Sequence, residues 1–188
     1  MINWHFIEEL EGAAVATGYV PLDKDGKPLG KSGVTIAGGV DLGQRSVNDW
    51  RRLAIHEATL EMIRPYCGVK GDAAVALLNE RPLVLGEAHV AELDNCLRAE
   101  FLRTVSERFN SASGRVRGPT WDDLSDREQT VVMSVAWQYG TPWKRCPTFW
   151  RLATTGRWGD VVDELRDFGD AYPTRRGKEA DYLEGKHV

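Results

Sequence analysis

Apolar residues near the N-terminus recur at helical spacing. Trp4, Ile7 and Leu10 lie three residues apart and fall on one face of a helix predicted over residues 3–10. Asn3 is a suitable N-cap for this helix, because its side-chain oxygen can accept a hydrogen bond from the first turn. A glycine follows the pattern, and glycine favours the end of a helix. We therefore expect a short helix with one apolar face.

Helical spacing resumes at Ser46 and continues almost to the end of the chain. Ser46 is expected to cap a helix of its own. The strongest pattern covers residues 125–139, where Ser125 and Glu128 form a capping-box pair ahead of a run of apolar residues. The strongest loop signal covers residues 110–120, which are rich in Ser and Gly. Further helices are predicted near residues 55–65, 72–80, 87–109, 147–155, 158–168 and 173–184.

The segment between the first helix and Ser46 has the character of β-structure. Residues 14–21 read as a strand that ends at a proline, and turn signals follow at residues 24–27 and 30–33. Residues 34–42 read as a second strand that two glycines interrupt. Together these segments predict a small β-rich lobe built on a hairpin.

The predicted elements give an α+β fold with two lobes. A small N-terminal lobe, roughly residues 1–45, carries the hairpin and the first helix, and residues 46–188 form a larger all-helical lobe. A length of 188 residues suits a single domain. The composition, with 42% hydrophobic and 28% charged residues and a net charge of −4, is typical of a globular protein and argues against nucleic-acid binding, which needs a basic face.

Two kinds of hydrolase fit the sequence poorly. Cys67, Cys96 and Cys146 are widely spaced and predict neither a disulfide framework nor a zinc knuckle. A cysteine peptidase could pair Cys67 with His56 or His89, although no nucleophile motif surrounds this cysteine. The four histidines are far apart, and no H-E-x-x-H signature is present, so no metal site is expected.

Carboxylates in the first 45 residues offer a different chemistry. Glu11 ends the first predicted helix, where it could face a cleft and act as a general acid. Thr35 and Asp41 lie six residues apart on a predicted strand, so a period of two puts both side chains on one face. Gly38 and Gly39 lie between them and leave room for a ligand. A hydroxyl and a carboxylate on one face can hold and activate a water molecule.

Several of these segments resemble a known family. Glu11-Gly12, Thr-Gly-Tyr-Val-Pro over residues 17–21 and Gly-Val-Thr-Ile-Ala-Gly-Gly-Val-Asp-Leu-Gly-Gln over residues 33–44 are similar to the pesticin-type branch of the phage-type lysozyme superfamily. Ser-Val-Ala-Trp-Gln-Tyr-Gly over residues 134–140 resembles the central helix of that family, and the segment 172–182 resembles its closing helix. The resemblance implies a two-lobed, lysozyme-like catalytic domain over residues 1–188.

The resemblance also implies roles for particular residues. Glu11, Thr35 and Asp41 match the order of catalytic residues in this branch, with Glu11 as the acid and Asp41, aided by Thr35, positioning water or stabilising the cationic centre. An arginine after the proline of the closing helix pairs with the catalytic glutamate. Arg175 matches it, with Arg176 adjacent, and both are expected to orient the acid.

Gln138 and Tyr139 are candidates for substrate binding, because the central helix of the family ends beside the site. The expected reaction is hydrolysis of the β-1,4 bond between N-acetylmuramic acid and N-acetylglucosamine in bacterial peptidoglycan, by a monomer without a cofactor. A catalytically inactive cell-wall-binding or toxin-associated module with a lysozyme fold is the alternative, as is a secreted antibacterial effector muramidase.

The expected location follows from segments that the sequence lacks. No apolar run reaches the roughly 20 residues that span a bilayer, and the N-terminus does not resemble a signal peptide. Membrane insertion is therefore not expected. A phage endolysin fits best, one that stays in the host bacterial cytoplasm until release and then acts on the cell wall in the periplasm.

Overall fold

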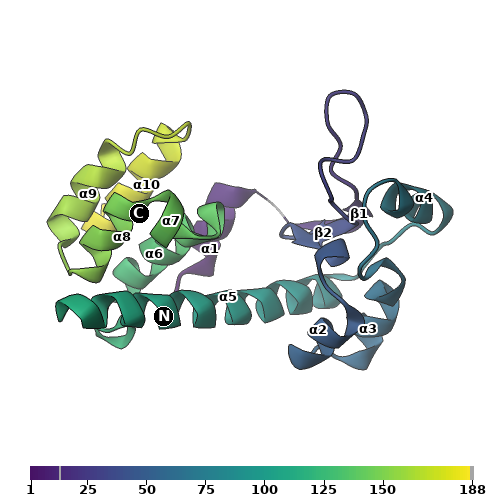
Figure 1. Ribbon diagram of the computed structural model, residues 1–188, viewed down its shortest axis with the longest axis horizontal. Helices are drawn as coiled ribbons and strands as arrows, with labels where there is room; N and C mark the ends of the chain where they lie inside the picture. Colours follow the sequence, from purple (N-terminus) through teal and green to yellow (C-terminus); the bar gives the residue numbers. More distant parts are fainter. Residues whose placement is uncertain (13, 187–188) are drawn as a thin grey trace. The chain divides into compact units, whose positions relative to one another are not determined.

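The computed structural model describes residues 1–12 and 14–186 (Figure 1). It has an α+β fold, in which helices predominate and a small antiparallel sheet lies near the N-terminus in sequence. The chain divides into two compact units: unit 1 comprises Met1–Glu11 and Leu102–Val188, and unit 2 comprises Gly12–Phe101. This division differs from the expected boundary near residue 45. The first helix belongs with the C-terminal segment, and the helices between residues 47 and 101 belong with the sheet.

Unit 2 carries the sheet and a set of short helices. The sheet has the order β1-β2-β3 and is antiparallel throughout. Its elements are β1 (Val15–Tyr19), β2 (Thr35–Ala37), β3 (Val40–Asp41), η1 (Leu42–Gln44), α2 (Val47–Arg52), α3 (Glu57–Ile63), η2 (Arg64–Tyr66), α4 (Asp72–Glu80) and the first part of α5 (Glu87–Val116).

The single strand predicted over residues 34–42 is wrong. Residues 35–41 form a tight hairpin, in which Ile36 pairs with Val40 and Thr35 pairs with Asp41. Its turn needs positive φ angles, and Gly39 (φ 94°) adopts one without strain. The two glycines therefore mark a turn rather than an interruption within one strand.

The core of unit 2 packs the hairpin against its helices. Ile36 of β2, Leu42 of η1 and Trp50 of α2 are fully buried in this core. Asp94 of α5 accepts a hydrogen bond from the Gly38 backbone N–H at 2.9 Å and so anchors the hairpin turn. Ser46 caps α2 through a capping box, as the sequence predicts for the start of this helix.

Unit 1 is all-helical. Its elements are α1 (Trp4–Glu11), the second part of α5, η3 (Trp121–Asp123), α6 (Asp126–Tyr139), α7 (Pro142–Arg145), α8 (Pro147–Thr154), α9 (Trp158–Arg166) and α10 (Pro173–Glu184). The short helices η3 and α7 were not predicted. The capping box of Ser125 and Glu128 is present at the start of α6, as predicted. None of the helices within the described residues has the length and apolarity needed to cross a bilayer.

The loop predicted over residues 110–120 is also wrong, because α5 continues to Val116. Phe109 and Ser113, one helical turn apart, are both buried, and this packing outweighs the loop-like composition. The chain then turns at Gly118, whose N–H donates to the Ser113 carbonyl at 3.0 Å. A β-carbon at Gly118 would overlap the Thr154 carbonyl oxygen.

Replacing Gly118 by alanine is expected to lower the free energy of unfolding by about 2–3 kcal/mol, because backbone must move to admit the methyl group. Gly114→Ala is the matched control, since a β-carbon there meets no atom within 4 Å. In the helix interior this change is expected to stabilise by about 0.5–1 kcal/mol. Urea denaturation measures both, and equal effects would contradict the packing described for Gly118.

Candidate active site

Glu11 is the last residue of α1, and the packing of α1 sets its position. Asn3 caps the helix by accepting the Phe6 backbone N–H at 3.1 Å, as predicted. The ring of Phe6 stacks on Tyr182 of α10, with ring centroids 4.2 Å apart. Ile7 is buried on the same helix. The helix tip that carries Glu11 is therefore fixed within unit 1.

Arg175 of α10 contacts Glu11 directly. Its Nη1 lies 2.6 Å from Oε1 of Glu11, and its side chain is only 10% exposed, against 35% for Glu11. The structure thus brings together the carboxylate and the arginine that the sequence selects. Arg175 also donates through Nε to Glu179 at 3.2 Å and through Nη2 to the Ser134 carbonyl at 3.1 Å.

Arg176, which was expected to orient Glu11 as well, makes other contacts. It is almost fully buried, donates to Asp170 at 3.0 Å and to Glu179, and lies over the ring of Phe168. Successive residues of a helix point about 100° apart, so Arg175 and Arg176 serve different partners. Arg176 belongs to the interior of unit 1.

Tyr139 and Gln138 end α6. The Tyr139 hydroxyl donates to Asp170 at 2.6 Å, and its ring stacks on Phe168. Burial raises the pKa of Tyr139 to about 12, and the contact with Asp170 adds to the rise. Tyr139 thus takes part in packing. The Gln138 side-chain oxygen is buried and accepts no hydrogen bond from the described residues.

In unit 2, Asp41 and Thr35 are direct partners across β2 and β3. Residues directly opposite each other in an antiparallel pair lie on the same face of the sheet. Thr35 and Asp41 therefore share a face, as expected, but because they are paired across a hairpin and not because they lie on one strand. Asp41 accepts backbone N–H groups of Gly33 at 3.0 Å and Gly43 at 2.9 Å, and the Gln44 amide at 3.1 Å. All of these partners are donors, which suits an acceptor carboxylate held in one orientation.

Close backbone contact makes this arrangement of Asp41 possible. A β-carbon on Gly33 would lie 2.5 Å from the α-carbon of Gly43 and 2.6 Å from the Val69 carbonyl oxygen. Only glycines allow the two N–H groups to converge on one carboxylate. Gln44 is itself fixed, because Lys70 donates to its oxygen at 3.0 Å. Sequence reasoning missed these supports, although the glycines and Gln44 belong to the motif that drew attention to Asp41.

The structure argues against a cysteine nucleophile. Burial raises the pKa of the Cys67 thiol to about 11, so little thiolate forms at neutral pH. His56 and His89 lie at a pocket of about 660 Å³ in unit 2, where they contact Glu92 and Thr59, respectively. Among the described residues, no three His, Cys, Asp or Glu side chains are grouped to hold a metal ion.

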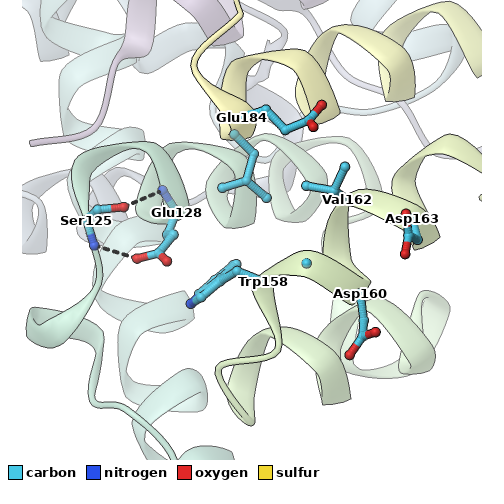
Figure 2. Close-up of a pocket in the computed structure, with 9 residues that line it drawn as sticks. Ser125, Glu128, Trp158, Asp160, Val162, Asp163 and Glu184 are labelled. Carbon is cyan, nitrogen blue, oxygen red and sulfur yellow. Dashed lines mark hydrogen bonds between the residues drawn. The ribbon is translucent and has the colours of Figure 1, made fainter.

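A second pocket, of about 590 Å³, lies in unit 1 and contains none of the predicted site residues (Figure 2). Three of its acidic residues, Glu128, Asp160 and Glu184, already make structural contacts. Glu128 completes the capping box with Ser125, as the dashed lines in Figure 2 show, and Asp160 pairs with Arg157. Glu184 pairs with Arg166. The predicted chemistry therefore has no connection to this pocket.

The model of the Pesticin family, described as a bacterial toxin homologue of phage lysozyme (C-terminal part), matches residues 1–159. The match covers Glu11, Thr35 and Asp41 and ends before α10, which carries Arg175. A search of the curated proteins found no match.

Asp170→Asn tests the buried network behind this site. Burial by itself raises the pKa of Asp170, but hydrogen bonds from Tyr139 and the Tyr172 N–H, with the charge of Arg176, outweigh it and lower the pKa. Such a carboxylate stabilises the fold above its unfolded-state pKa, and the contribution is lost as the pH falls through its folded-state pKa.

We expect the variant to lose about 2 kcal/mol of unfolding free energy at pH 7 and progressively less below about pH 4. Urea denaturation at pH 7 and pH 3 measures the difference. Asp163→Asn, an exposed change on α9, is the control and should stay near the wild type. An equal loss at both pH values would show that the charge of Asp170 is not responsible.

Proposed function

This chain belongs to the pesticin family of phage-lysozyme homologues, and on that premise we propose that it is a peptidoglycan muramidase. The observation that carries the proposal is the ion pair between Glu11, at the tip of α1, and Arg175. A half-exposed carboxylate with one oxygen on a fixed cation is oriented for transfer of a proton. The proposed substrate bond is the β-1,4 linkage between N-acetylmuramic acid and N-acetylglucosamine.

Glycoside hydrolysis needs an acid that protonates the leaving oxygen. We assign this role to Glu11. Arg175 holds the carboxyl group in one orientation, and its positive charge stabilises the carboxylate that remains after the proton has left. Lysozymes and most other glycosidases use a carboxylic acid in this way.

The reaction also needs a group that supplies water or stabilises the cationic sugar. We assign this role to Asp41. Its carboxylate is held by backbone N–H groups and by Gln44, so it is already oriented before substrate binds. Thr35, its partner across the hairpin, is buried, and its hydroxyl donates to the Gly33 carbonyl at 3.4 Å, so we assign it a supporting role beside Asp41.

Substrate contacts are proposed for the end of α6. Gln138 is half-buried at this helix end, and its unpaired oxygen is buried, so contact with the N–H of an acetamido group, which both sugars of peptidoglycan carry, requires the side chain to turn outward. For Tyr139, whose hydroxyl donates to Asp170, the proposed contact is made through the ring. Neither contact requires a cofactor, and we propose that the protein acts as a monomer.

As the biological setting we propose host lysis by a phage endolysin, released from the cytoplasm to the periplasm. The family description favours a second setting, because it names a bacterial toxin. In that case the chain would be the lytic module of a toxin or secreted effector. Both settings use the same reaction. The next experiment distinguishes both of these active enzymes from an inactive wall-binding module.

Glu11→Gln is expected to reduce hydrolysis of purified sacculi by about 10³-fold, because the amide cannot donate the proton. Glu8→Gln makes the same change one turn earlier on α1 and should keep the wild-type rate. Mass spectrometry of the wild-type digest should show new reducing ends on muramic acid. Reducing glucosamine ends, anhydro-muramic ends or free peptide stems would contradict the proposed bond, and an unchanged Glu11→Gln rate would contradict the assigned acid.

Asp41→Asn is expected to cost about 10²–10³-fold in rate, with Asp25→Asn in the exposed turn as its control. The double variant Glu11→Gln/Asp41→Asn tests whether the two groups serve one step. Groups that act together are strongly non-additive, so the double variant should be little slower than the slower single variant. Multiplied losses would mean that the two carboxylates act independently.

A further inference from the structure

Glu179 is an ionisable side chain in the core of unit 1 with no exposed surface. It lies on α10, one turn after Arg175. A buried carboxylate is costly unless its oxygens are paired, and an apolar side chain would pack at this position without that cost. A buried carboxylate at this position therefore indicates a role beyond packing.

Both oxygens of Glu179 accept hydrogen bonds. Oε1 accepts from Nε of Arg175 at 3.2 Å and from the Ser134 hydroxyl at 2.5 Å, and Oε2 accepts from Nη1 of Arg176. Burial raises the pKa of Glu179, and the two arginines and Ser134 oppose that rise. Because every partner is a donor, the ionised carboxylate is the form that these contacts hold.

The guanidinium of Arg175 is held by contacts with residues of three helices. Nη1 contacts Glu11 of α1, Nε contacts Glu179 of its own helix, and Nη2 contacts both the carbonyl oxygen and the hydroxyl of Ser134 on α6. A planar guanidinium held at all three nitrogens cannot rotate without breaking one of these contacts. Its one positive charge is shared between two carboxylates.

The other groups around this cluster complete the charge balance. Arg176 pairs with Asp170 as well as with Glu179. Tyr139 and Cys146 stay neutral, because burial raises their pKa values to about 12 and about 11. On the α9 side, Arg166 pairs with Asp181 and Glu184. Apart from Glu11, the cluster therefore contains two arginines and two carboxylates, and its formal charge is zero.

We propose that Glu179 is a positioning residue that fixes the Arg175 guanidinium against Glu11 and neutralises part of its charge. The inference rests on the proposed role of Glu11 as the acid. An arginine paired with Glu11 alone would strongly favour the ionised carboxylate and so oppose proton donation. The second carboxylate keeps the orienting contact and weakens that effect.

Glu179→Gln tests the charge. The amide oxygen can still accept from Arg175 and Ser134, so the change removes a negative charge and little volume. The midpoint at which the Glu11 carboxyl titrates, followed by ¹³C NMR, is expected to move about 1 pH unit lower, as loss of a nearby unit charge predicts. The alkaline limb of the activity profile should move by the same amount, since activity needs the protonated acid.

Asp170→Asn is the matched control. It also removes one negative charge, but from a carboxylate that contacts Arg176, and it leaves every contact of Arg175 in place. Its Glu11 midpoint should stay within about 0.3 pH unit of the wild type. A Glu179→Gln midpoint equal to that of the wild type overturns the proposal. A lower midpoint in a protein without muramidase activity supports the role of Glu179 and overturns the proposed function instead.

Wild-type protein provides a second measurement, which decides the matter if Glu179→Gln does not fold. The Nε–H of Arg175 should exchange with solvent at least about 10²-fold more slowly than that of the half-exposed Arg157, because it donates to a buried carboxylate. Equal exchange rates for these two arginines would overturn the proposal.

Discussion

Three helices of unit 1 meet at the guanidinium of Arg175. Glu11 from α1, Ser134 from α6 and Glu179 from α10 each take one of its nitrogens. A cation that is 10% exposed must find acceptors, and those acceptors must come from the helices packed around it. The end of α1 and the middle of α6 are therefore held in place by charge as well as by apolar packing. The same contact gives the half-exposed carboxylate of Glu11 its orientation.

Much of the helical structure could be predicted from the sequence, because its signals are local. Ser46 and Ser125 mark helix starts through their own hydrogen bonds, and the helix predicted near residues 72–80 is observed as α4. The extension of α5 could not be predicted in this way. It depends on burial of Phe109, whose ring contacts that of Trp150 on α8.

The residues of the candidate site were found by different routes. The period of a single strand predicts that Thr35 and Asp41 share a face. In the structure they share a face because they are opposite each other in a hairpin. Arg175 came from the family resemblance, and its contact with Glu11 is present. Glu179 was missed, because a charged residue in an otherwise polar helix sequence looks exposed. Only the packed neighbours reveal that it is buried.

The division of the chain has a consequence for biosynthesis. Unit 2 is a continuous segment, whereas unit 1 joins α1 to helices that follow residue 101. A ribosome therefore releases α1 early, and its carboxylate remains without its cation until the last helix has emerged. Any shortened product that stops before α10 would contain all three candidate catalytic residues and still lack the groups that orient the first of them.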